Sequence, residues 1–140
     1  GFRNAIAPAD MVLVVTNPEV SAVRDADRII GLIEAEEKGP AKIIINRINP
    51  QLIKRGDMLD VPDVLELLAV DLIGIVPEDE TVTVSTNRGH PVVLDNHSKA
   101  GTAFTNIARR MNGETVPFEQ LDGRNGLLDR LSKMLRPGAN

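Results

Sequence analysis

Three apolar runs that alternate with helix-forming segments constrain the fold of this chain more than any other feature. The runs cover residues 11–16, 41–46 and 72–76 and are rich in Val, Ile and Leu. They lack the polar alternation of a strand with one face in water, so they are typical of parallel strands covered on both faces. Between them, apolar side chains recur at helical spacing in residues 20–33 and 64–68. This order predicts an α/β fold with a parallel sheet and helices on its faces.

The first helix is predicted from the residues that flank it. Asn17 is a favourable N-cap, and Pro18 suits the first helical position. The apolar spacing continues to Lys38, where Gly39 and Pro40 would end the helix. We therefore expect one helix between the first and second strands.

Two further helices are predicted from their own caps, and one segment is ambiguous. Asp60 and Ser98 are suitable N-caps, and residues 47–60 before the first of these helices read as a polar loop. Residues 81–86 alternate Thr or Ser with Val, which favours a strand. The same residues also suit a short helix that follows the turn at residues 77–79.

Polar residues stand where each predicted strand ends. The three groups are residues 16–19, Asn46-Arg47 and Pro77-Glu78-Asp79. Turn formation and helix capping explain each group taken singly. Ligands bind beyond the carboxyl ends of the strands in open parallel sheets, however, so the meeting of all three at one edge favours a binding site. The residues alone leave both interpretations open.

Several motifs that carry chemistry are missing from the sequence. There is no G-x-x-x-x-G-K-[ST] phosphate loop, no G-x-S-x-G and no cysteine. His90 and His97 lie seven residues apart in a predicted loop, and a two-histidine metal site there is the weaker interpretation. We therefore predict no metal site and no catalytic residue in this chain. The net charge of −4 argues against a broad nucleic-acid surface.

The end of the chain differs from the rest in charge and pattern. Residues 124–136 include four basic residues and one acidic residue. At 100° per residue the apolar side chains share one arc, as in helices that lie on anionic membranes. The residues predicted to contact the membrane are Leu127, Leu128, Arg130, Leu131, Lys133, Met134 and Leu135. A groove on a partner protein and packing on the chain's own core are the alternatives. No apolar run approaches the ~20 residues that span a bilayer, so the contact predicted is peripheral.

Five short segments form a recognisable set together with the tail: residues 16–28, residues 46–50 (Asn46-Arg47 with Asn49-Pro50), residues 55–59, residues 76–79 and residues 87–95. This set resembles the MinD proteins, which are septum site-determining members of the deviant Walker A ATPases. The same ATPases also include ParA-type partitioning proteins. Residues 55–59 and the tail separate the MinD pattern from that of ParA relatives. The resemblance divides the chain into the C-terminal half of an ATPase domain (1–113), a linker (114–123) and a membrane-targeting tail (124–140).

The resemblance implies a P-loop NTPase-like three-layer fold and an ATP-dependent switch. An ATP-bound homodimer would hold the cytoplasmic face of the inner membrane (or a chloroplast membrane), recruit the division inhibitor MinC, and leave when MinE stimulates hydrolysis. The nucleotide-binding residues implied are Asn46, Arg47, Pro77, Glu78 and Asp79. The dimer or partner surface implied is formed by Glu19, Ser21, Arg24, Asp25 and Asp27. The family pattern also favours a helix over a strand for residues 81–88.

The chain departs from the family pattern in one large respect. The phosphate loop with its two lysines, the switch segments and the aspartate that supports magnesium are absent, and the resemblance places them before Gly1. We therefore expect ATP and Mg²⁺ as cofactors of the intact family protein and no ATP hydrolysis by this chain alone. A ParA-type partitioning ATPase and a non-enzymatic membrane adaptor are the alternative functions. No nucleic-acid partner is expected for the leading interpretation.

Overall fold

A computed structural model describes residues 1–119 and 121 of the chain. Three strands form one parallel sheet in the order β1-β2-β3. They are β1 (Val12–Thr16), β2 (Ala41–Ile48) and β3 (Asp71–Pro77). The helices are α1 (Phe2–Ile6), α2 (Val20–Ala35), α3 (Pro50–Arg55), α4 (Val61–Leu68), α5 (Glu80–Asn87), the 3-10 turn η1 (Val92–Leu94) and α6 (Lys99–Met111). The predicted α/β class with a parallel sheet is confirmed.

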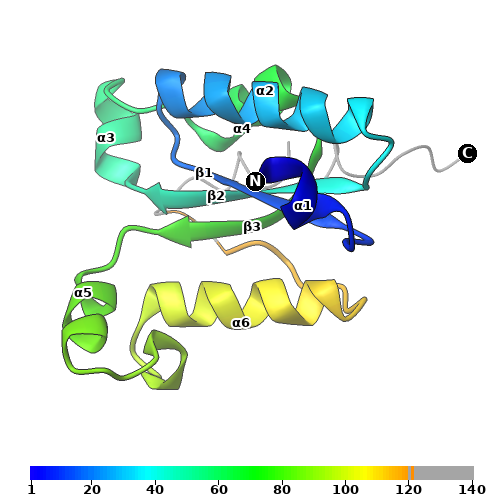
Figure 1. Ribbon diagram of the computed structural model, residues 1–140. Coiled ribbons are helices and arrows are strands. Elements are labelled where there is room, and N and C mark those ends of the chain that lie inside the picture. The colour runs from blue at the N-terminus through cyan, green and yellow to red at the C-terminus, as the bar shows by residue number, and fades with distance from the viewer. Residues whose placement is uncertain (120, 122–140) are drawn as a thin grey trace, which may run out of the picture.

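Helices cover both faces of the sheet (Figure 1). Helices α2 and α4 lie on one face, and α6 lies on the other. The core on the α2 and α4 face is aliphatic and includes Ile33, Ile43 and Val64, none of which is exposed. The core on the α6 face includes Ile44, Ile73, Val76, Ala103 and Ile107. Strands buried on both faces explain why the three apolar runs lack polar alternation.

Helix α6 approaches β3 closely because Gly74 has no side chain. A Cβ at Gly74 would collide with the Cδ1 and Cγ1 atoms of Ile107. The glycine therefore lets the helix lie directly on the strand, which brings the start of α6 near the end of β3.

Strand β1 has one open side among the described residues. It pairs only with β2, and the Val15 side chain is 58% exposed. An apolar strand of this kind is normally paired and covered on both sides. The described part of the sheet is therefore open at β1.

The first predicted helix has different ends in the structure. It begins at Val20 with Glu19 as N-cap, because the Glu19 amide bonds the Asn17 carbonyl (2.8 Å) and holds residues 17–19 in a turn. The prediction of Asn17 as N-cap is therefore wrong. The helix ends at Ala35, before Lys38, because Glu37 has a positive φ and the Lys38 amide bonds the Ile33 carbonyl (3.0 Å).

The polar loop predicted for residues 47–60 is also partly wrong, because it contains α3. The Asn49 side chain caps this helix, Pro50 takes its first position, and Gly56 ends it with φ 81°. Strand β2 also runs past Asn46 to Ile48.

The remaining helix predictions agree with the structure. The Asp60 side chain accepts from the Asp63 amide, and the Ser98 side chain accepts from the Gly101 amide, so both predicted caps are confirmed. Residues 80–87 are helical, as the family resemblance implied, and the strand interpretation of residues 81–86 is wrong. The tail at residues 124–140 lies outside the described residues. Within the described part, no helix is long and apolar enough to cross a bilayer.

Candidate functional site

The end of β2 bends at the predicted site. The register with β3 shifts between Ile45 and Ile48, and Arg47 between them has a φ of 56°. A left-handed conformation is uncommon for a residue other than glycine and is typical of irregular positions near functional sites. The bend places the half-buried Asn46 and the exposed Arg47 at the carboxyl edge of the sheet.

Glu78 joins the end of β3 to the end of β2. Its Oε2 atom accepts from Asn49 Nδ2 (2.9 Å), and its Oε1 atom lies 3.4 Å from Arg47 Nη2. Its backbone amide donates to the Ile48 carbonyl (2.9 Å). The Asn49 amide and then the Arg47 guanidinium hold the pKa of Glu78 below its ordinary value. These contacts fix the two strand ends relative to each other.

Asp79 joins the end of β3 to the starts of α5 and α6. Its carboxylate accepts from the Thr81 amide (2.9 Å), from the Ser98 hydroxyl (2.7 Å) and from the Ala100 amide (3.0 Å). Burial raises the pKa of Asp79, but the hydrogen bonds from Ala100, Ser98 and Thr81 outweigh it, so the pKa lies well below its ordinary value. The carboxylate therefore stays ionised and holds the loop after β3 rigidly.

The end of β1 lies at the same edge of the sheet, but it contacts a different loop. Thr16 pairs in register with Ile45, one residue before Asn46. Pro18 is fully buried, and its carbonyl accepts from the Leu59 amide (3.2 Å). The structure thus brings Arg47 and Glu78 into direct contact, whereas residues 16–19 meet the loop that follows α3.

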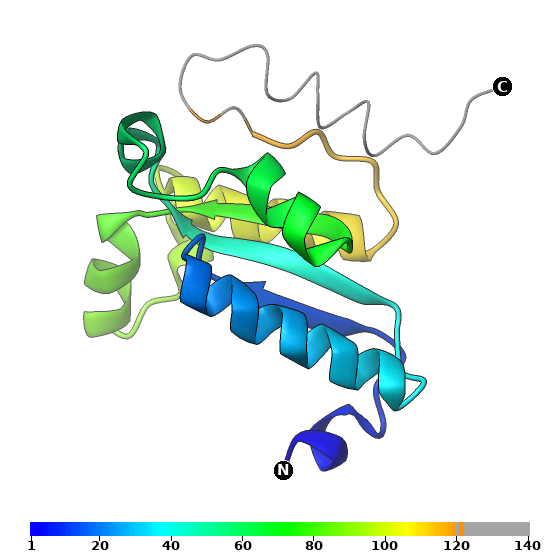
Figure 2. The ribbon, with the colours of Figure 1, turned by 90° about the horizontal axis from the view of Figure 1, so that it is seen from above.

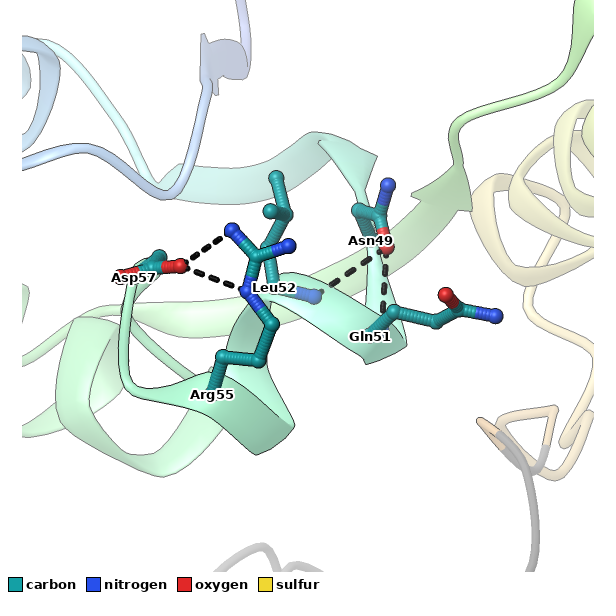
Figure 3. Close-up of polar contacts among 5 residues, drawn as sticks. All are labelled: Asn49, Gln51, Leu52, Arg55 and Asp57. Carbon is teal, nitrogen blue, oxygen red and sulfur yellow. Dashed lines mark hydrogen bonds and ion pairs between the residues drawn. The ribbon is translucent and has the colours of Figure 1, made fainter.

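Sequence reasoning missed the part that Asn49 plays in this site (Figure 3). Its Oδ1 atom caps α3 by accepting from the Gln51 and Leu52 amides, at 3.0 and 3.3 Å. Its Nδ2 atom donates to Glu78, which lies outside the residues drawn in the figure. The Asn-Pro pair followed six residues later by glycine is the signal that could have revealed the helix. Beyond the helix, Arg55 Nε donates to Asp57 Oδ2 (2.8 Å), which closes the Arg-Gly-Asp turn on itself.

The predicted dimer or partner surface lies along the start of α2. Glu19 is the N-cap, and the other members project from the helix; all are exposed, namely Glu19, Ser21, Arg24, Asp25 and Asp27. The helix is held to the sheet by Val23, Ala26, Ile30 and Ile33 on its opposite face. The side chains of this surface therefore take no part in the chain's own core.

The histidines line a separate cavity. His90 and His97 lie with Arg88 and Asp95 around a hollow of about 350 Å³ between α5 and η1. Within the described residues, no group of three or more histidine, cysteine, aspartate or glutamate residues is arranged to hold a metal ion.

Comparison with curated proteins identifies close relatives, although no protein-family model matches the chain. The chain is 49% identical over 140 residues to the septum site-determining protein MinD of Synechocystis sp., covering 99% of this chain and 53% of that protein. It is 47% identical over 126 residues to MinD of Bacillus subtilis, covering 89% of this chain and 47% of that protein. The chain therefore spans about half the length of the curated relatives it matches.

Comparison with solved structures also finds MinD proteins. The MinD cell division protein of Aquifex aeolicus superposes with a TM-score of 0.83 at 48% identity, covering 86% of this chain and 51% of that chain. A MinC:MinD complex from the same organism gives the same TM-score. MinD of Pyrococcus horikoshii, solved with Mg-ADP, and a ParA family ATPase of Chlorobium tepidum share the fold, at TM-scores of 0.64 and 0.60 and identities of 24% and 17%. The fold is that of the MinD/ParA P-loop NTPases, and the chain belongs to the MinD family.

Proposed function

We propose that this chain supplies the adenine-binding edge of an ATP-dependent cell-division switch of the MinD type. The observation that carries the proposal is the linkage of two strand ends through Glu78, with Asp79 tying the same loop to α5 and α6. Such an edge of a parallel sheet is where nucleotides bind in this class of fold. Mg-ADP bound to the P. horikoshii protein supports the same ligand class.

The chemistry of the edge suits a purine base. Both carboxylates are already engaged by the protein's own donors, so they shape the loop and leave its backbone to meet the base. Asn46 adds a side-chain amide, which offers both a donor and an acceptor, as the edge of adenine requires. The sequence holds no phosphate loop, so we assign the phosphates and Mg²⁺ of ATP to other parts of the whole protein. For the chain of 140 residues alone we expect no ATP turnover, and turnover by a preparation free of other enzymes would contradict this.

Base binding can be tested with a single substitution in the whole protein. Asn46→Ala removes one side-chain amide, which we expect to weaken ATP binding by about tenfold, the equivalent of one hydrogen bond. Asn87→Ala, at the exposed end of α5, is the matched control and should bind ATP as the wild type does. Equal ATP affinity in wild type, Asn46→Ala and control, measured by calorimetry, would remove the assignment.

The partner surface is proposed at the start of α2. Its exposed acidic residues include Glu19, Asp25 and Asp27. MinC is the partner we propose, because the MinD of A. aeolicus forms a complex with MinC. A homodimer formed on ATP and release by MinE complete the proposed cycle.

Membrane binding is proposed for the tail, at the cytoplasmic face of the inner membrane or in a chloroplast. Leu131→Glu places a charge in the apolar arc, and we expect it to abolish sedimentation of the whole protein with anionic vesicles. Asn125→Glu, outside the arc, adds the same charge as a control. Sedimentation that survives Leu131→Glu would remove the membrane proposal. DNA binding that survives deletion of residues 124–140 would favour a partitioning function instead.

A further inference from the structure

One arginine of α6 binds two backbone carbonyls of the segment that follows the helix. The Arg110 guanidinium donates from Nη1 to the Ile73 carbonyl of β3 (3.0 Å). It also donates from Nε to the Val116 carbonyl (3.0 Å) and from Nη2 to the Pro117 carbonyl (2.9 Å). One side chain thus connects the helix, the strand and the segment. We name residues 114–119 the strap.

Two further contacts extend the attachment along the strap. The Phe118 ring lies against the Arg110 guanidinium, 4.1 Å from its centroid, and Asn106 Nδ2 donates to Glu119 Oε1 (2.9 Å). Phe118 and Leu121 pack against the core on the α2 and α4 face, whereas α6 covers the opposite face. The strap therefore passes around the β3 side of the sheet from one layer to the other (Figure 2).

Strand β3 is irregular at Ile73, where Arg110 bonds it, and its outer edge has no strand beside it in the described part of the sheet. In the register of β3 with β2, Leu72 pairs with Ile43 and Gly74 pairs with Ile44, so Ile73 is an extra residue. β3 is the last strand of the described sheet, and it has no further strand beside it there. Unpaired backbone groups on such an edge are sites at which other chains pair. The Arg110 bond supplies a partner for the carbonyl of the extra residue.

We propose that Arg110 holds the strap along the outer edge of β3, and that it thereby sets the path of the chain as far as Leu121. While the Arg110 hydrogen bonds are made, the strap shields the outer edge of β3 from pairing with another strand. When Arg110 no longer holds them, the six strap residues are free to take any span up to about 20 Å, and the chain after them is no longer held at one place on the sheet. Arg110 is a positioning residue, since it acts through the backbone of the strap and of β3.

The test is amide hydrogen exchange of the whole protein with two neighbouring arginines compared. Arg110→Met keeps the helix and much of the apolar stem but removes every donor. Arg109→Met is the matched control, because the only hydrogen bond or ion pair of the Arg109 side chain within the described residues is an exposed ion pair with Glu114, the first residue of the strap (2.8 Å). We expect Arg110→Met to speed exchange of the strap amides at least tenfold, and Arg109→Met to change it less than threefold. Peptides of α2 should exchange alike in all three proteins.

Strap exchange that is equal in Arg110→Met and wild type, or equally faster in both arginine variants, would overturn the proposal. If Arg110→Met does not fold, Phe118→Ala gives the same test from the strap side, with tenfold faster exchange expected and an unchanged rate against the proposal. Light scattering adds an independent measure, because an opened β3 edge should make Arg110→Met associate as its concentration rises. A variant that exchanges faster but stays monomeric would overturn the shielding role.

Discussion

The substitution Asp79→Asn tests how the loop after β3 is held. It keeps the shape of the side chain and the acceptor for the Thr81 amide, but it replaces the oxygen that receives Ser98 and Ala100 with a donor. The Ser98 hydroxyl is almost fully buried and already accepts from the Gly101 amide, so it has little freedom to reorient. Two donors therefore lose their acceptor. Hydrogen bonds to charged groups contribute about 1.5–3 kcal/mol each, and partial exposure of the carboxylate reduces this, so we expect a loss of about 2–3 kcal/mol.

The same substitution makes a prediction about pH. The pKa of Asp79 is lower in the folded protein than its unfolded value of about 3.9. A depressed pKa stabilises the folded state fully above the unfolded pKa, and this contribution is lost as the pH falls toward the folded pKa. The stability difference between wild type and Asp79→Asn should therefore be constant from pH 5 to 7 and shrink progressively below about pH 4.

Urea denaturation of the purified whole protein measures both effects. Glu80→Gln is the matched control, because it removes an exposed carboxylate from the next position, and it should change the free energy of unfolding by less than about 0.5 kcal/mol. A loss at pH 7 that is equal in the two variants would show that the Asp79 hydrogen bonds do not stabilise the loop. A difference between wild type and Asp79→Asn that stays constant down to pH 2 would contradict a depressed pKa of Asp79.

Two further predictions concern packing and the second strand end. Gly74→Ala should lose about 1–3 kcal/mol because its Cβ meets Ile107, whereas Gly31→Ala, which has open space inside α2, should gain about 0.5–1 kcal/mol; thermal denaturation separates the two. Equal effects would show that α6 can move away from β3 at little cost. Asn49→Ala should raise the pKa of Glu78 toward its ordinary value, which NMR titration of that carboxyl measures, and it should lose about 1 kcal/mol as a helix cap. An unchanged titration of Glu78 would contradict the linkage of the two strand ends.

The strands and the later helix caps could be predicted from the sequence because their signals are local. Runs of buried aliphatic residues identify the three parallel strands, and Asp60 and Ser98 bond amides only three residues away. The first helix was placed less well. Its start depends on a turn at residues 17–19, and its end on a glutamate in a left-handed conformation that glycine usually takes.

The candidate site could be predicted only as a set of positions. The rule that ligands bind beyond parallel strands identified Asn46, Arg47 and residues 77–79. The contacts that organise them were not predictable, because Asn49 and Glu78 are 29 residues apart and Asp79 and Ser98 are 19 apart. Local propensity also failed for residues 81–86, since the Asp79 cap turns an alternating β-branched segment into α5.

Amide hydrogen exchange of the whole protein, with and without Mg-ADP, tests whether this edge of the sheet binds the adenine base. ADP binding should slow exchange for residues 46–49 and 78–81, and it should leave residues 30–35 unchanged, because the end of α2 leads to the start of β2 at the opposite edge of the sheet. GDP at the same concentration should protect these residues less, because the site is proposed to read the base. Protection by ADP that leaves both segments unchanged would contradict the assignment of the adenine site to this edge of the sheet.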